Sequence, residues 1–285
     1  MRTLALLVVT AIWGWTFVLV KEGVQEIGPF WFLALRFAIA TGLALPLLSR
    51  RLSATRPRDW ARGAVLGTAL FCGYFFQTWG LVYTTAQKSG LITGLSVVLV
   101  PPIAWLWGQR TSGRTWAGVV LAAVGLSLLV LGGGEPLGPT GFGDLLTILC
   151  ALAFALYLVL LDRYTKSADF LSLFLPQLGV VALLSLVGAY VWEVPTFRLS
   201  LRTWQALLIT GALASTLAFF VLTWVQRRST AAYTAIVLAS EPAFAALFGW
   251  LLLGESLRGL QILGGALIFL GIMLPQLGTH TDSVI

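Results

Sequence analysis

The sequence predicts an all-α integral membrane protein with ten transmembrane helices arranged as two inverted five-helix repeats. Three observations support this fold class: a low share of charged residues, a series of long apolar segments, and an internal repeat. Of 285 residues, 58% are hydrophobic and 10% are charged, whereas a soluble domain has roughly 25% charged residues. A chain so poor in charge would not stay dissolved in water, so we expect lipid around most of its surface.

Ten apolar segments are each long enough to cross a membrane, because about 20 helical residues span the hydrocarbon core. They cover residues 3–20, 30–48, 61–83, 88–107, 114–132, 144–161, 170–191, 204–225, 230–253 and 258–277. No connection between them is long enough to hold a soluble domain. The first segment follows Arg2 as a signal peptide would, but Lys21 and Glu22 follow it in place of a small-x-small cleavage site. A retained helix is therefore expected.

The positive charges predict the orientation in the membrane. If the N-terminus is cytoplasmic, twelve Lys and Arg residues lie on the cytoplasmic side and five on the opposite side. Cytoplasmic loops carry the excess of Lys and Arg, so both termini are expected in the cytoplasm, with the chain in a bacterial inner membrane. The same loops account for the net charge of +7 without nucleic-acid binding.

An internal repeat appears at an offset of 141 residues, which places Pro101 on Pro242. We therefore predict two five-helix repeats, residues 1–137 and 138–285. An odd number of spans forces the second repeat to enter the membrane inverted relative to the first. Inverted repeats are typical of secondary transporters, in which two similar halves rock around a site near the middle of the bilayer.

The prolines of the repeat predict helix bends. Pro242 lacks the N–H that would bond the carbonyl of Leu238, and Pro101 with Pro102 has the same effect in the first repeat. The freed carbonyls need partners or must line a wet cavity. Two paired hinges and two static kinks filled by packing both remain open.

Glu241 is the one charged residue in the apolar stretch Ile236–Gly254, near the middle of its span. A charge at that depth costs at least about 2.5 kcal/mol on insertion scales, so the side chain is expected to face the bundle interior. Three roles remain open. Glu241 could bind a substrate ammonium, carry a proton as coupling ion, or hold a neighbouring helix through hydrogen bonds or an ion pair with Arg36.

Arg36 and Lys88 lie nearer the ends of their spans. Arg36 is six residues into its segment, about 9 Å deep at 1.5 Å per residue. It could snorkel to the outer interface, or point inward to form an ion pair or to bind a substrate carboxylate. Lys88 begins its segment and could anchor the helix at the interface or attract an anionic group to the mouth of a cavity.

Aromatic and small polar residues near mid-depth favour a roomy pocket for a flat, partly apolar solute, although each residue alone could be core packing. Buried Tyr and Trp need partners for their polar ends. The candidate substrate-binding residues are Trp13, Phe17, Tyr74, Gln77, Thr78, Tyr83, Lys88, Tyr157, Phe219 and Tyr233. The candidate gating or coupling residues are Glu241, Pro242, Pro101 and Arg36.

An intramembrane enzyme is the rival class, because GFGD at residues 141–144 matches the GxGD pattern of intramembrane aspartyl proteases. Such chemistry needs two carboxylates close enough to share a proton. Asp162 is eighteen residues after Asp144, so about 27 Å away along a helix, and Asp144 is more simply a helix N-cap. His280 is the only histidine, and Cys72 and Cys150 have no metal or disulfide spacing. The sequence thus predicts no enzyme, metal site or cofactor. A channel would need a continuous polar stripe, which the chain lacks.

Short motifs carry a resemblance to a known family. Trp13-Gly14, Phe17, Lys21, Pro29 and Arg36-Phe37 near the start, with Glu241-Pro242 and Gly254-Glu255 near the end, resemble the drug/metabolite transporter superfamily, in particular its EamA-type ten-helix exporters. Within it the chain is most similar to the YddG-type exporters of aromatic amino acids. One departure is Val100-Pro101 in the first repeat, where the second has Glu241-Pro242.

This resemblance implies a secondary transporter that exports small amphipathic metabolites, with aromatic and other neutral amino acids as the expected substrates, through a central cavity. Because the family keeps the glutamate across differing substrates, a structural or gating role for Glu241 is the favoured one. The alternative is a proton-coupled multidrug or quaternary-amine exporter. The expected partners are a small molecule and the lipid bilayer; proton coupling stays open.

Overall fold

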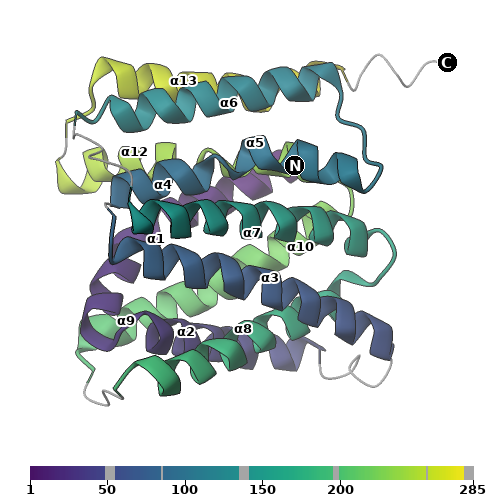
Figure 1. The fold of residues 1–285 in the computed structure, drawn as a ribbon, viewed down its shortest axis with the longest axis vertical. Coiled ribbons are helices and arrows are strands. Elements are labelled where there is room, and N and C mark those ends of the chain that lie inside the picture. The colour runs from purple at the N-terminus through teal and green to yellow at the C-terminus, as the bar shows by residue number, and fades with distance from the viewer. Residues whose placement is uncertain (49–54, 85, 135–140, 195–198, 255, 279–285) are drawn as a thin grey trace.

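The computed structural model describes residues 1–48, 55–84, 86–134, 141–194, 199–254 and 256–278. Within these ranges every regular element is a helix (Figure 1). The first half contains α1 (Arg2–Ile27), α2 (Pro29–Leu48), α3 (Pro57–Leu81), α4 (Ala86–Gly94), α5 (Ser96–Leu106) and α6 (Gly113–Leu131). The second half contains α7 (Phe142–Thr165), α8 (Phe170–Trp192), α9 (Leu201–Ile209), η2 (Thr210–Leu217), α10 (Ala218–Gln226), α11 (Ala231–Leu238), α12 (Glu241–Leu253), α13 (Gly259–Met273) and η3 (Leu274–Gly278).

Eight helical stretches among the described residues are long and apolar enough to cross a membrane, so the chain is a multi-pass membrane protein. They cover residues 29–46, 88–106, 113–131, 142–165, 170–192, 201–226, 231–251 and 259–277. The first helix contributes a shorter apolar stretch, Arg2–Thr16, and α3 is not among the eight. All ten predicted segments are helical, but the count of ten spans stays a prediction for these two helices.

Hydroxyl side chains in the connections fix where several helices begin. Ser112 accepts a hydrogen bond from the Thr115 N–H at the start of α6, and Ser200 does the same for Thr203 at the start of α9, each at 3.2 Å. Such N-caps satisfy backbone donors that have no partner inside the helix. At the other end of a helix, Gly254 has a φ of 70° and ends α12 in the left-handed conformation that glycine adopts readily.

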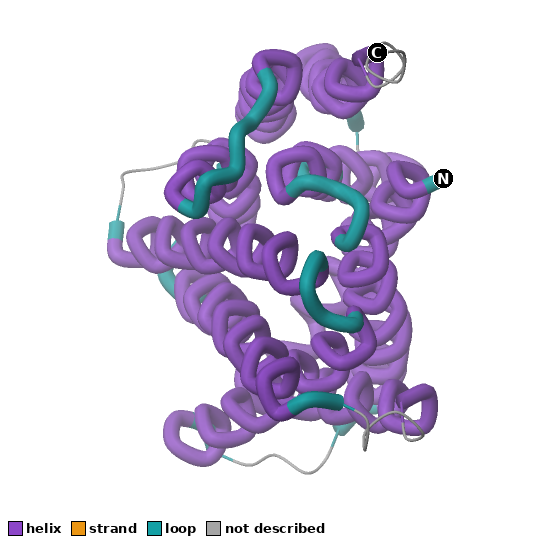
Figure 2. Tube along the Cα trace, turned by 90° about the vertical axis from the view of Figure 1, so that its right-hand side faces the viewer, coloured by secondary structure: helices purple, strands orange, loops and turns teal. Residues whose placement is uncertain are grey.

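The helices lie side by side in layers (Figure 1). Helices α6 and α13 pack together at one end of the long axis, and α2 and α8 pack together at the other. Between them, α7 packs against α3 and α5, while α1 packs against α10 and α12. Figure 2 shows the bundle from the side, with the connections crossing its near face. The core therefore runs along the middle layers, where α1, α3, α7 and α10 meet.

Glycines bring α6 and α13 into close contact. A methyl group on Gly125 would lie 2.5 Å from the Gly264 carbonyl oxygen, and one on Gly264 would lie 2.5 Å from the Gly125 carbonyl oxygen. Gly118 and Gly271 are related in the same way, at 2.6 and 2.7 Å. Small residues let membrane helices approach until their backbones touch, which maximises van der Waals contact in a lipid solvent.

Two carboxylates clamp helix starts across the two halves of the chain. Glu193, directly after α8, accepts hydrogen bonds from the N–H groups of Phe30 and Trp31, both at 2.9 Å. Glu26, in the last turn of α1, accepts from the backbone N–H and hydroxyl of Ser200 at 2.6 and 2.7 Å, and from the hydroxyl of Thr203. Negative charge at a helix N-terminus is favourable because the first N–H groups point at it.

The first turn of α1 and the end of η3 lie toward the same side of the bundle, on the right in Figure 1. On that side the Arg2 guanidinium donates to the Arg228 carbonyl, between α10 and α11. That both termini face the cytoplasm stays a prediction from the positive charges.

Candidate functional site

A π-helical segment, η2, interrupts the span formed by α9 and α10. Its wider turn leaves the Ala214 carbonyl available to other helices: Trp13 Nε1 donates to it at 2.8 Å and Arg36 Nη2 at 3.2 Å. The Thr216 hydroxyl donates back to the Gly211 carbonyl at 2.8 Å. Single π-helical turns inside α-helices occur frequently at functional sites, so this segment is the starting point for the candidate site.

Arg36 points into the bundle, where its side chain is buried. Besides the bond to Ala214, its Nε donates to the Ser215 hydroxyl at 2.7 Å. Its guanidinium carbon lies 5.5 Å from the ring centroids of both Phe37 and Tyr74. The structure thus places this charge among aromatic rings and neutral acceptors, away from the outer interface to which it could have snorkelled.

Aromatic rings from five helices, α1, α2, α3, α7 and α10, meet around this arginine. Tyr74 lies edge-on to Phe37 and to Phe154, at centroid distances of 5.4 and 5.6 Å. Phe219 contacts Trp13 at 5.7 Å and Phe37 at 6.1 Å. Edge-on and tilted ring pairs at these distances are favourable beyond their buried area. This set, with Tyr157 at 6.3 Å from Phe219, is called the ring cluster below.

Glu241 is the first residue of α12 and its side chain is half-buried. Among the described residues its carboxylate has neither a hydrogen bond nor an ion pair within 4 Å. A carboxylate at mid-span costs about 2.5–3.5 kcal/mol to insert. Its charge is therefore not offset by direct contacts in this conformation.

Helix α1 holds the start of α12 in place through close backbone contact. A methyl group on Gly14 would lie 2.8 Å from the Ala245 nitrogen and 3.0 Å from the Glu241 carbonyl oxygen. Just before this point Thr10 shares a hydrogen bond of 3.1 Å with the Ser240 hydroxyl. These contacts hold the start of α12 against α1, next to Trp13 of the ring cluster.

The helix breaks differ from those expected at the prolines. In the second half, α11 ends at Leu238 and α12 starts at Glu241, so Pro242 lies in the first turn of a new helix, where a missing N–H costs little. In the first half, α5 runs through Pro101 and Pro102, and the break lies earlier, at Leu95. The interruption expected at Pro101 is thus displaced by six residues, to the junction between α4 and α5.

Lys88 forms a buried ion pair with Asp144, with 2.6 Å between Nζ and Oδ2. The Thr84 hydroxyl donates to the other oxygen of Asp144 at 2.8 Å, and the Gly141 N–H donates to Oδ2 at 2.8 Å. Asp144 therefore lies three residues after the N-cap, Gly141, and bonds back to it; the expectation that Asp144 itself is the N-cap was wrong. Sequence reasoning considered both charges separately and missed their pairing.

Other predicted site residues lie outside the ring cluster. Tyr83 is exposed and contacts Phe142 at 5.4 Å. The Tyr233 hydroxyl shares a 2.8 Å hydrogen bond with Thr3, near the start of α1. The Thr78 hydroxyl donates to the carbonyl of Tyr74 in its own helix, and Gln77 is half-buried. The Phe17 side chain lies outside the described residues.

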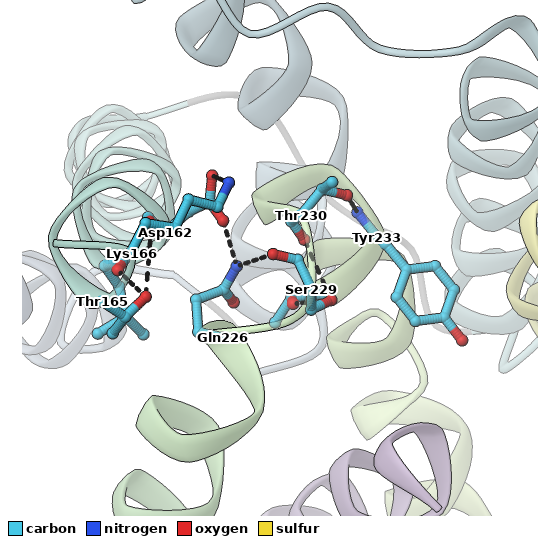
Figure 3. A network of polar contacts seen from close by, with 9 residues as sticks. Asp162, Thr165, Lys166, Gln226, Ser229, Thr230 and Tyr233 are labelled. Carbon is cyan, nitrogen blue, oxygen red and sulfur yellow. Dashed lines mark hydrogen bonds and ion pairs between the residues drawn. The ribbon is translucent and has the colours of Figure 1, made fainter. Parts of the chain in front are cut away.

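A second buried carboxylate, Asp162, lies at the far end of α7 (Figure 3). Its oxygens accept from Lys166 Nζ at 2.9 Å and from Gln226 Nε2 at 3.1 Å. Gln226 also donates to the Ser229 carbonyl at 3.3 Å, which ties α7 to the turn after α10. Asp144 and Asp162 thus serve separate networks at opposite ends of one helix, and neither is placed to share a proton with the other.

Similar proteins bear the names of transporters. An "uncharacterized transporter" from Archaeoglobus fulgidus is 35% identical over 96% of this chain and 85% of its own length. The "uncharacterized transporter YoaV" from Bacillus subtilis is 28% identical over 95% of each chain. A crystal structure of a protein with 22% identity matches the fold with a TM-score of 0.80, over 97% of this chain and 96% of that one.

The helical bundle and these relatives define a multi-pass membrane transporter rather than an enzyme. The chain belongs to the EamA-like transporter family, whose model matches residues 2–131 and again residues 141–275. The membership agrees with the drug/metabolite transporter resemblance; the similarity to the aromatic amino acid exporters within that superfamily stays a prediction.

Proposed function

We propose that this chain is a secondary transporter that exports small amphipathic metabolites, with aromatic and other neutral amino acids as substrates, across the bacterial inner membrane. The observation that carries the proposal is the ring cluster around Arg36 and Glu241, built by α1, α2, α3, α7, α10 and α12 in the middle of the bundle. Aromatic walls with a few convergent polar groups are typical of small-molecule sites.

Alternating access between two inverted five-helix repeats, residues 1–137 and 138–285, would expose this site to each side in turn. The two separate matches to one family model support the division. So does the packing: α3 contacts α7 and α8, while α10 contacts α1, and η2 contacts α2. Such matching contacts between helices at equivalent places support a two-fold relationship between the halves.

In this proposal Trp13, Tyr74, Tyr157 and Phe219 line the substrate site, with Gln77 and Thr78 on the next turn of α3. The break before Glu241 and Pro242 and the break at Leu95 are the points at which α11–α12 and α4–α5 could bend. Lys88, Tyr83 and Tyr233 lie nearer the ends of the helices and would contact a substrate only on its way in or out.

One observation favours a second candidate, the export of quaternary amines or other cationic drugs. The Glu241 carboxylate has no hydrogen bond among the described residues and lies near aromatic rings. The carboxylate and the ring faces would both attract an ammonium group. Export of such cations would use Glu241 to exchange the substrate for a proton. Arg36, in the same cluster, weighs against this candidate because it repels a purely cationic solute.

Counterflow in proteoliposomes tests the proposal. Vesicles preloaded with unlabelled L-phenylalanine should take up labelled L-phenylalanine, and not labelled sugars, against empty vesicles as the control. An imposed pH gradient should change the rate only if a proton is coupled. Counterflow of a quaternary amine without counterflow of any amino acid would replace the first candidate with the second.

A further inference from the structure

Arg36 and Glu241 are two opposite charges that share one cluster without forming an ion pair. They come from α2 and α12, and Arg36 is only 4% exposed. The ion pairs among the described residues, within 4 Å, are Arg62–Asp59, Lys88–Asp144 and Lys166–Asp162. Yet the two residues are close, because Glu241 lies beside Gly14 of α1, and the neighbouring Trp13 donates to the same Ala214 carbonyl as Arg36. The two charges are therefore close but separated by more than the length of a direct contact.

Neither charge is compensated by a hydrogen bond to a group of opposite charge among the described residues. Arg36 donates to a hydroxyl and to a backbone carbonyl, both neutral, and the Glu241 carboxylate has no hydrogen bond within the described part of the chain. Elsewhere the same fold pairs its buried charges directly, as in Lys88 with Asp144 at 2.6 Å. Buried charges usually are paired, because an unpaired one loses its hydration without compensation.

We propose that Arg36 and Glu241 form a two-point receptor for the zwitterionic head of an α-amino acid, the carboxylate binding Arg36 and the ammonium binding Glu241. The inference rests on the proposed function and names the chemistry of its site. Neither residue has an ion-pair partner within 4 Å among the described residues. In the complex each would gain one from the substrate, with the α-carbon of the substrate lying between them.

The surroundings of the pair support this assignment. Tyr74 and Phe219 offer ring faces and edges for an apolar or aromatic side chain. A solute with only a positive charge is repelled by Arg36 and one with only a negative charge by Glu241, so the pair selects against both by repulsion.

Three probes with the same ring and different heads test the receptor: L-phenylalanine, phenethylamine and 3-phenylpropionate. Each would compete with labelled L-phenylalanine in counterflow, and its binding would be measured separately by tryptophan fluorescence of the purified protein. For the natural sequence we expect phenylalanine to bind about ten- to a hundredfold more tightly than either analogue, which is the effect of losing one charged hydrogen-bond partner.

The two charge-removing variants should each weaken phenylalanine binding and should shift the preference toward different analogues. Glu241→Gln should weaken phenylalanine about ten- to a hundredfold and leave 3-phenylpropionate unchanged or tighter, because the repelling carboxylate is gone. Arg36→Gln should weaken phenylalanine equally and favour phenethylamine. Exposed residues at helix ends supply matched controls: Asp169→Asn and Arg163→Gln should leave all three affinities unchanged.

Arg36→Lys covers the case in which Arg36→Gln does not fold. It keeps the charge but loses the planar fork that binds a carboxylate bidentately, so phenylalanine should bind more weakly while phenethylamine does not change. Equal losses for all three probes, or unchanged phenylalanine affinity in Arg36→Lys and Glu241→Gln, would overturn the receptor. Phenylalanine binding with the expected preference but no counterflow would refute transport and leave the receptor standing.

Discussion

Lys88 and Asp144 join the two halves of the chain through an ion pair of 2.6 Å, both side chains being at most one-tenth exposed. Lys88 lies in the first turn of α4 and Asp144 in the first turn of α7. Thr84, in the turn after α3, donates to the same carboxylate. This end of the bundle is therefore held by a charge network that spans the connection between α3 and α4.

Asp144→Ala should destabilise the protein by about 3 kcal/mol, because breaking a buried ion pair from one side removes the charge that compensates the other. Thermal unfolding in detergent micelles would measure this loss. The double variant Lys88→Met with Asp144→Ala should recover most of it, since it removes both charges. A single Asp144→Ala variant as stable as the natural protein would show that the pair contributes nothing.

Glu26 should make the protein sensitive to acid. Hydrogen bonds from Thr203, and then from Ser200, lower the pKa of Glu26 below its ordinary value of 4.5. A carboxylate whose pKa is lower in the folded state adds stability above its unfolded pKa and loses that stability as the pH falls through the folded value. Unfolding measured between pH 6 and strongly acidic pH should thus show a decline below pH 4.5 that is reduced in Glu26→Gln.

Glu193 should change the pH dependence of stability in the opposite sense to Glu26. Burial raises its pKa above 4.5, although the bonds from Phe30 and Trp31 oppose the rise. A group with a raised folded pKa contributes its stability fully below the unfolded value and loses it as the pH rises through the folded value. In Glu193→Gln, stability should therefore fall less on going from pH 4.5 upward. The same slope in both proteins would contradict this prediction.

Trp13→Phe should cost about 0.5–1.5 kcal/mol, the net contribution of one hydrogen bond. The ring stays available to pack on Phe219, but the donation of Nε1 to the Ala214 carbonyl is lost. Arg36 continues to bond that carbonyl, so the π-helical segment keeps one of its two partners. Denaturant unfolding would measure the change; a loss above about 3 kcal/mol would mean that packing, and not the hydrogen bond, dominates.

The helices were predictable because long apolar runs leave few alternatives in a membrane, and the Ser and Thr caps stand where the runs begin. The direction of the Arg36 side chain could not be predicted, because a residue six positions into a span can reach either the interface or the interior. Its partner Ser215 lies in a π-helical turn that no periodicity in the sequence marks. The pairing of Lys88 with Asp144 depends on how α4 and α7 pack, which local sequence does not determine. The break at Leu95 also has no sequence signal stronger than Gly94.

Gly125→Ala should destabilise the contact between α6 and α13, although alanine normally stabilises a helix. The added methyl group would lie 2.5 Å from the Gly264 carbonyl and 2.9 Å from the Ile268 nitrogen, both backbone atoms that cannot turn away. Forcing the helices apart costs about 1–3 kcal/mol. Gly42→Ala is the matched control, because a methyl group there meets nothing within 4 Å. It should raise the stability by about 0.5–1 kcal/mol through the helix propensity of alanine. Opposite shifts in thermal midpoint for the two variants would support the contact, and equal upward shifts would mean that α6 and α13 are not in close contact in the membrane.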